Sequence, residues 1–281
     1  MFTLHNGDCL EIMPTLPAGS VDAIITDLPY GTTACAWDTV IPFAPMWEQV
    51  KRVLKPSGAF ITTASQPFTS ALIMSNPKFF KDEWIWDKNT PTGFLNAKRS
   101  PLKQHESVCV FASGKYTYNP QMVLKNYKGY RSNKNHSQGS LPDGIYGDKL
   151  VKNGNRSDYR YPKTILFYQS LSGHNAGIHK TQKPVALYDS LIKTYTNEGE
   201  TVLDIAMGSG TTIEAAERTG RNSIGIEKDE GIFQSAVLRL KSFTPSNNRM
   251  HLTAFGVESP ASIPLQSNLF AEVPAAKLGG K

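Results

Sequence analysis

The stretch that decides the fold is Thr201–Thr212, with the sequence TVLDIAMGSGTT. A short apolar run ends at Asp204, the turn Gly208-Ser209-Gly210 follows, and a helical pattern begins near Thr211. Glycines let the backbone of such a turn approach a ligand, and the first N–H groups of the helix are free to bind it. About twenty residues past the turn, the next predicted strand ends in Glu227, where an acid can bind ribose hydroxyls. The pattern predicts a site for a nucleoside-containing cofactor, although an ordinary turn between a strand and a helix also fits it.

Strands and helices alternate on both sides of this stretch. The predicted strands are Val21–Thr26, Ala59–Thr63, Glu83–Asp87, Ser107–Ala112, Thr201–Ala206 and Ser223–Glu227. The predicted helices are Pro45–Leu54, Pro184–Tyr195, Thr211–Arg218 and one that carries Ile232 to Leu240. This alternation predicts an α/β fold with a doubly wound, mostly parallel sheet that is covered on both faces.

A second motif, Asp27-Leu28-Pro29-Tyr30, follows the strand Val21–Thr26 directly. The carboxyl end of a strand is where open α/β sheets bind their ligands. Methylation of the amine of a base requires an oxygen that accepts hydrogen bonds from its N–H groups. It also requires an aromatic face that holds the planar base. Asp27, the Leu28 carbonyl and Tyr30 supply these groups. Such a tetrapeptide also arises by chance, so the prediction depends on its combination with the glycine turn.

The positive charge of the chain is concentrated in one segment. The formal net charge is +6, and the segment 113–178 has ten Lys or Arg residues against three acids. It also has eight of the eleven tyrosines and is rich in Gly, Asn, Ser and Pro. Basic residues among tyrosines suit a surface that binds phosphates and stacks on bases, although a solvated loop-rich lobe would look similar. We expect Lys125, Lys128, Arg131 and Arg156 to contact the phosphates or bases of a nucleic acid.

The remaining composition narrows the class of protein. Hydrophobic residues make up 40% of the 281 residues, which is enough for a substantial core. No run approaches the roughly 20 apolar residues that span a bilayer, and the first residues lack the pattern of a secretory signal. The three cysteines have no metal-ligand spacing, so we expect no metal site. A cytoplasmic protein is therefore predicted.

Together these motifs resemble the amino-group DNA methyltransferases, which modify adenine N6 or cytosine N4, and in particular their beta-ordered class, in which the catalytic motif precedes the cofactor motif. The resemblance extends from about Gly7 to Leu240. Asp27–Tyr30 is similar to the family's Asp-Pro-Pro-Tyr tetrapeptide, and HKTQKPVALYDSL (His179–Leu191) to the segment before the cofactor motif. Two departures stand out: Leu28 replaces a proline, and Ala206-Met207 replaces the usual Pro-Phe pair.

The resemblance implies S-adenosylmethionine as the cofactor and a fold of the S-adenosylmethionine-dependent methyltransferase type. The catalytic residues it implies are Asp27, Leu28, Pro29 and Tyr30. The cofactor-binding residues it implies are Asp8, Cys9, Thr181, Gln182, Lys183, Pro184, Asp204, Ala206, Gly208, Gly210, Thr211 and Glu227. The chain then divides into a catalytic half (1–112), a target-recognition insertion (113–178), a cofactor-binding half (179–256) and a flexible tail (257–281).

The predicted reaction is site-specific methylation of adenine N6 in duplex DNA by base flipping. Cytosine N4 is the nearest alternative because the same groups can act on its amine. Methylation of RNA or of a protein amide, and a non-catalytic DNA-binding relative, are more distant alternatives. The resemblance also implies DNA as a partner, and it leaves a homodimer and a restriction endonuclease of the same system open.

Overall fold

The computed structural model describes residues 1–33, 35, 38–124, 159–170, 182–243 and 250–254. The strands of the main sheet are β1 (Phe2–Asn6), β2 (Val21–Asp27), β3 (Leu54–Ala64), β4 (Phe80–Thr92), β5 (Lys103–Phe111), β8 (Ile165–Phe167), β9 (Thr201–Asp204), β10 (Asn222–Glu227) and β11 (Met250–Ala254). Their order across the sheet is β11-β1-β10-β9-β2-β3-β5-β4-β8. The first six strands in this order are parallel, whereas β5 runs antiparallel to both of its neighbours. β6 (Val123–Leu124) and β7 (Tyr159–Arg160) form a separate pair.

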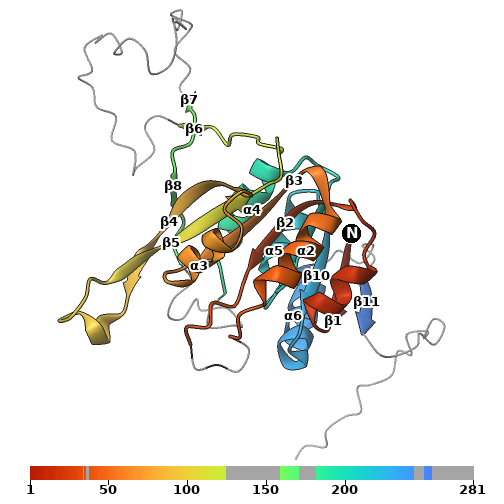
Figure 1. Ribbon diagram of the computed structural model, residues 1–281, viewed down its shortest axis with the longest axis horizontal. Helices are drawn as coiled ribbons and strands as arrows, with labels where there is room; N and C mark the ends of the chain where they lie inside the picture. Colours follow the sequence, from red (N-terminus) through yellow and green to blue (C-terminus); the bar gives the residue numbers. More distant parts are fainter. Residues whose placement is uncertain (34, 36–37, 125–158, 171–181, 244–249, 255–281) are drawn as a thin grey trace, which may run out of the picture.

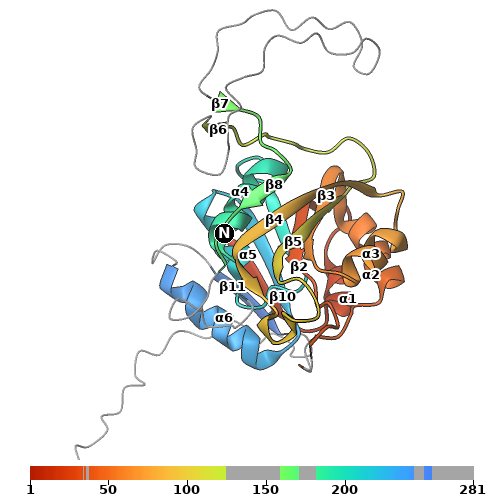
Figure 2. The ribbon, with the colours of Figure 1, turned by 90° about the vertical axis from the view of Figure 1, so that its left-hand side faces the viewer.

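Helices cover both faces of the sheet. One face carries α1 (Cys9–Ile12), α2 (Phe43–Val53) and α3 (Phe68–Ser75), and the other carries α4 (Val185–Tyr195), α5 (Thr211–Arg218) and α6 (Glu230–Phe243). Two short 3₁₀ turns are η1 (Met13–Thr15) and η2 (Phe94–Asn96). Figure 2 shows the first group to the right of the sheet and the second to the left. This three-layer arrangement confirms the predicted α/β fold.

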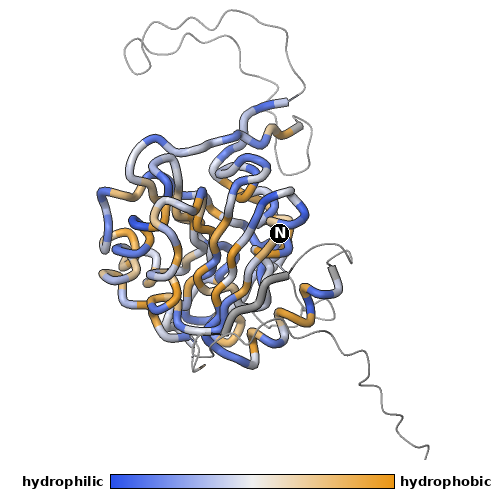
Figure 3. The backbone as a smooth tube through the Cα atoms, turned by 90° about the vertical axis from the view of Figure 1, so that its right-hand side faces the viewer, coloured by the Kyte–Doolittle hydropathy of each residue, from blue (hydrophilic) through white to orange (hydrophobic). Residues whose placement is uncertain are grey.

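The central strand β2 shows why the apolar run at Val21–Thr26 is continuous. Ile24 packs into the core beside Trp47 of α2, whereas Ile25 packs into the opposite core beside Tyr188 of α4. A parallel strand that is buried on both faces has apolar residues at successive positions. In Figure 3 hydrophobic segments accordingly run through the middle of the molecule, along the strands.

The order of the strands determines where in the sheet a ligand is expected to bind. From β9 the chain passes through α5 to β10 on one side, and from β2 it passes through α2 to β3 on the other side. Because β9 and β2 are neighbours, their carboxyl ends flank the point where the direction of winding changes. Ligands of open α/β sheets bind at this point. Asp27 and Asp204 are the last residues of these two strands.

Some elements differ from the predicted ones. β4 is thirteen residues long rather than five, because it continues beyond the body of the sheet as a hairpin with β5. The strand predicted at Thr201–Ala206 ends at Asp204, whose carboxylate accepts a hydrogen bond from the Ala206 N–H and so closes a turn. Ile165–Phe167, inside the predicted insertion, pairs with β4. The predicted tail, 257–281, lies outside the described residues. Within the described part of the chain, no helix is long and apolar enough to cross a membrane.

Candidate active site

A cavity of about 550 Å³ opens at the carboxyl ends of the parallel strands. Its walls come from the segments that follow β1, β2, β9 and β10 and from the segment that precedes α4. The predicted site residues that line it are Asp8, Cys9, Asp27, Leu28, Pro29, Tyr30, Gln182, Lys183, Ala206, Gly208, Thr211 and Glu227. The fold therefore brings the tetrapeptide that was predicted to be catalytic and the glycine turn to one cavity.

Three of the predicted residues support the cavity without lining it. Asp204 lies below the turn, where its Oδ1 accepts hydrogen bonds from Thr26 Oγ1 (2.7 Å) and from the Ala206 N–H (3.1 Å). Gly210 has φ +79° and approaches Leu240 so closely that an added Cβ would lie 2.9 Å from its side chain. Pro184 precedes α4. The predicted residues Thr181, Lys125, Lys128, Arg131 and Arg156 lie outside the described residues.

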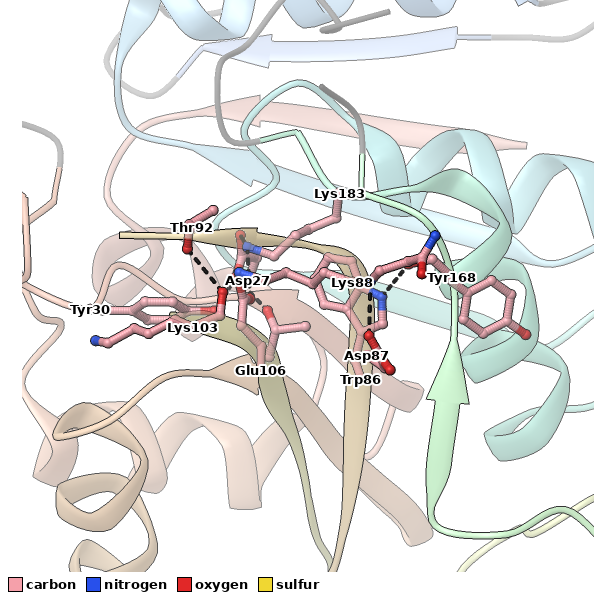
Figure 4. A network of polar contacts seen from close by, with 12 residues as sticks. Asp27, Tyr30, Trp86, Asp87, Lys88, Thr92, Lys103, Glu106, Tyr168 and Lys183 are labelled. Carbon is pink, nitrogen blue, oxygen red and sulfur yellow. Dashed lines mark hydrogen bonds and ion pairs between the residues drawn. The ribbon is translucent and has the colours of Figure 1, made fainter. Parts of the chain in front are cut away.

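Neighbouring side chains hold the carboxylate of Asp27 in place. Its Oδ1 accepts hydrogen bonds from the Tyr30 hydroxyl (2.7 Å) and from Thr63 Oγ1, and its Oδ2 lies 2.8 Å from Lys183 Nζ (Figure 4). The ring of Tyr30 stacks on Phe68 with 5.2 Å between centroids and 30° between planes. The Asp27 side chain is still 27% exposed, because it faces the cavity. A fixed carboxylate with access to the cavity can accept a hydrogen bond from a bound ligand.

Lys183 joins Asp27 to a second carboxylate. Its Nζ lies 3.4 Å from Glu106 Oε2, and Lys88 Nζ lies 3.1 Å from Glu106 Oε1 (Figure 4). Burial alone would lower the pKa of Lys183, but the carboxylates of Asp27 and Glu106 outweigh it and raise that pKa. Burial, with the same two carboxylates, also raises the pKa of Tyr30 well above its usual value. Lys183 thus stays charged and Tyr30 stays a hydrogen-bond donor.

The other half of the cavity is built around Glu227, the last residue of β10. Its Oε2 accepts a hydrogen bond from the Gly208 N–H and its Oε1 accepts one from the Asp229 N–H, both at 2.9 Å. Gly208 has φ +52° and only open space where a Cβ would stand, so its backbone is accessible from the cavity. Asp8 caps α1 and pairs with Lys228 Nζ at 3.0 Å. Carboxylates and accessible backbone here suit the hydroxyls of a nucleoside.

The geometry agrees with comparisons to known proteins. The family model described as DNA methylase matches residues 21–238, which include the tetrapeptide, the glycine turn and Glu227. The chain belongs to this DNA methylase family. It is 26% identical to the type II methyltransferase M.HinfI of Haemophilus influenzae over 96% of this chain and 76% of that protein. It is 28% identical to M.HpaI of Haemophilus parainfluenzae over 84% of this chain and 73% of that protein.

Solved structures of DNA methyltransferases share the fold of this chain. The M1.HpyAVI–SAM complex is 27% identical to the methylase, with a TM-score of 0.56 over 85% of this chain and 99% of that chain. The cytosine-N4-specific PvuII DNA methyltransferase, at 17% identity, has a TM-score of 0.59 over 88% of this chain and 90% of that chain. The likeness to the PvuII enzyme shows the fold alone.

Sequence reasoning missed several residues of the methylase site. Thr63 lies directly opposite Asp27 in the register of β2 with β3, and Glu106 lies near the start of β5. Asp38 accepts hydrogen bonds from three successive backbone N–H groups, of residues 31, 32 and 33, and so fixes the loop after Tyr30. A threonine at a strand end could have indicated Thr63. Glu106 is in no recognisable motif, because only the tertiary fold brings it to Lys183. Asp38 lines the cavity and binds its own loop, but a lone acid in a loop gives no sequence signal.

The buried carboxyl of Asp204 makes stability depend on pH. Burial raises its pKa to about 6, although hydrogen bonds from Thr212 and Thr26 oppose this. Between the ordinary value near 4 and about 6, the folded methylase keeps a proton that the unfolded chain has lost. The free energy of unfolding should therefore fall as pH rises through this window, by up to about 1.4 kcal/mol per pH unit from this group. Denaturant unfolding at several pH values checks this, and an Asp204→Asn variant should lack that component. An equal slope in the variant would contradict it.

Proposed function

We propose that this methylase transfers a methyl group from S-adenosylmethionine to N6 of adenine in duplex DNA, with the target base rotated out of the helix into the cavity. One observation carries the proposal: a fixed carboxylate, an aromatic ring and a glycine turn with its acidic partner line the same cavity. Catalysis on a base requires its removal from the stack, and a pocket with polar acceptors and an aromatic face can receive it.

The residues present fit S-adenosylmethionine. The cavity volume is within the range of small-molecule sites, roughly 300–1,000 Å³. Gly208 presents open backbone, Glu227 is placed for ribose hydroxyls, and Asp8 and Cys9 form the wall beside them. Gln182 Oε1 is a buried acceptor with no hydrogen-bond partner among the described residues, and its side chain lines the cavity. The cofactor, when bound, supplies an electrophilic methyl group on a positively charged sulfur.

The protein's own residues would prepare the amine. Asp27 and the Leu28 carbonyl would accept hydrogen bonds from the two N–H groups of the amine. These hydrogen bonds would turn the nitrogen lone pair toward the methyl group. Tyr30 would hold the ring of the base, and Pro29 keeps the turn rigid. Lys183 and Thr63 keep the Asp27 carboxylate oriented, and a carboxylate has enough lone pairs to accept from the base as well. Positioning of this kind provides much of the rate in such direct transfers.

Adenine is preferred over cytosine because the tetrapeptide begins with Asp27 rather than with serine, which by the family resemblance favours N6. The alternative is cytosine N4, since the family covers both amines. Expression in a host without DNA methylation, followed by nucleoside analysis of its genomic DNA, distinguishes them. We expect N6-methyladenine to appear. If only N4-methylcytosine appears, the proposed transfer to an amino group stands, but its target is cytosine.

The segment 113–178 is proposed as the target-recognition lobe between a catalytic half (1–112) and a cofactor-binding half (179–256). Its basic, tyrosine-rich composition supports contact with DNA through Lys125, Lys128, Arg131 and Arg156. A restriction endonuclease with the same recognition sequence and a homodimer are the partners that would suit a type II enzyme. A cytoplasmic location, where DNA and the cofactor are available, follows from the same proposal.

Replacement of Tyr30 separates the role of its ring from that of its hydroxyl. Tyr30→Phe keeps the stacking surface and loses one hydrogen bond to Asp27, so we expect kcat/KM to fall only a few-fold. Tyr30→Ala removes the surface, and loss of about 1–3 kcal/mol of base stacking should lower kcat/KM about 5- to 150-fold. Steady-state methylation of duplex DNA measures both variants. Equal losses in the two variants would contradict a stacking role for the ring.

A further inference from the structure

The hairpin of β4 and β5 extends well beyond the edge of the sheet that holds the active site. The register pairs Asp27 with Thr63, Thr63 with Val108, and Val108 with Trp84, so these four residues mark one level across the sheet. From that level β5 reaches back five more residues to Lys103, or about 17 Å at the usual rise of a strand. Since β4 runs in the same direction as β2, the tip of the hairpin lies on the catalytic side. Figure 1 shows it as the yellow projection at the lower left.

The tip presents two large apolar side chains to solvent. Phe94 is 66% exposed and Leu95 is fully exposed. The turn is nevertheless well formed: Gly93 has φ +91°, the Asn96 N–H donates to the Gly93 carbonyl (2.9 Å), and the Ala97 N–H donates to the Phe94 carbonyl (3.1 Å). Among the described residues Leu95 is the most exposed large apolar side chain. Two adjacent apolar side chains that an ordered turn holds in the open form a small apolar surface that a partner can cover.

The charge of the same hairpin indicates the class of partner. Between Asp87 and Glu106 the sequence has four basic residues and no acid. Three of them, Lys98, Arg99 and Lys103, are exposed at the tip, and none of these three forms an ion pair with any described residue. A second copy of the chain would bring the same positive charge to a symmetric contact. A polyanion is complementary to it.

We propose that the tip of this hairpin, residues 93–103, is a DNA-contacting element that enters a groove of the duplex beside the target base. A two-stranded β ribbon fits the major groove, which is about 12 Å wide. Lys98 and Arg99 would contact phosphates, while Phe94 and Leu95 would pack against base edges or deoxyribose rings. The hairpin lies outside the segment 113–178, so it adds a second DNA contact to the one that the composition predicts. The inference rests on the DNA methyltransferase function.

Paired substitutions of exposed residues test the hairpin. Lys98→Ala with Arg99→Ala should weaken binding of a labelled mixed-sequence duplex, and should reduce the slope of log K against log salt by about 1.8, or about 0.9 for each lost phosphate contact. The matched control is Lys78→Ala with Lys81→Ala, which removes two exposed lysines at the opposite end of β4. This control should keep the wild-type affinity and salt slope. Phe94→Ala with Leu95→Ala should weaken binding at an unchanged slope.

All variants should keep wild-type affinity for S-adenosylmethionine, because the predicted cofactor residues lie in other segments of the chain. The inference is overturned if the Lys98 and Arg99 variant binds DNA with the affinity and salt slope of the wild type. It is equally overturned if the Phe94 and Leu95 variant keeps its DNA affinity but loses self-association in light scattering, which would assign the tip to a second copy. Failure of the wild-type protein to bind or methylate duplex DNA would instead contradict the function itself.

Discussion

Asp27→Ala is expected to lower kcat for methyl transfer by at least about 10²–10³-fold, the range found when one preorganised polar group of an active site is removed. The carboxylate is the group that would accept a hydrogen bond from an N–H of the target amine. Three neighbours hold it in position: Tyr30, Thr63 and Lys183. Cofactor affinity should change little, because Glu227 and Gly208 belong to the ends of other strands and bond to each other rather than to Asp27. Single-turnover methylation and calorimetric titration of the cofactor measure the two quantities separately.

The structure also indicates that this variant will fold. Lys183 would lose Asp27 but would keep Glu106, so no buried charge is left without a partner. Asp27→Asn is the matched control, because it keeps the size of the side chain and one acceptor oxygen. It replaces the other oxygen with a donor that faces Lys183, so we expect a loss close to that of alanine. Full activity in either variant would remove Asp27 from the mechanism.

Glu227→Ala is expected to weaken binding of S-adenosylmethionine by about 10²-fold. Hydrogen bonds to a charged group contribute about 1.5–3 kcal/mol, and loss of about 2.7 kcal/mol corresponds to that factor. The variant would lose the acceptor for ribose hydroxyls and would also release the N–H groups of Gly208 and Asp229 that shape the turn. Isothermal titration calorimetry with the cofactor gives the change in Kd directly.

Glu227→Gln separates recognition from support of the turn. The amide keeps one oxygen that can accept from Gly208, so the turn should persist, and the loss in affinity should be closer to tenfold. The thermal unfolding midpoint of both variants without cofactor reports on the turn itself. An unchanged Kd in Glu227→Ala would contradict the placement of the ribose at this acid.

The sequence was most informative where local pattern and tertiary role coincide. The run Val21–Thr26 is apolar at successive positions because β2 is buried on both faces, and the glycines at 208 and 210 have positive φ in the turn that the pattern predicted. The alternation of strands and helices was enough to predict a doubly wound sheet. Its strand order then determines that Asp27 and Asp204, far apart in the chain, end at neighbouring positions.

Other parts of the site depend on contacts that no local pattern records. Glu106 is an unremarkable acid in the sequence, yet the antiparallel strand β5 brings it within 3.4 Å of Lys183. The hairpin tip was missed because β4 continues past its apolar core, Trp84 to Trp86, into polar residues that look like a loop. Its exposure on the side of the sheet where β2 ends at Asp27 becomes visible only when the strands are assembled.

The most direct test is transfer of a labelled methyl group from S-adenosylmethionine to unmethylated duplex DNA by the purified protein, followed by separation of the nucleosides. We expect the label in N6-methyladenine with the wild-type protein and none with Asp27→Ala. Label in N4-methylcytosine would contradict the choice of base. Absence of label from DNA, in a protein that binds the cofactor, would contradict the proposed reaction as a whole.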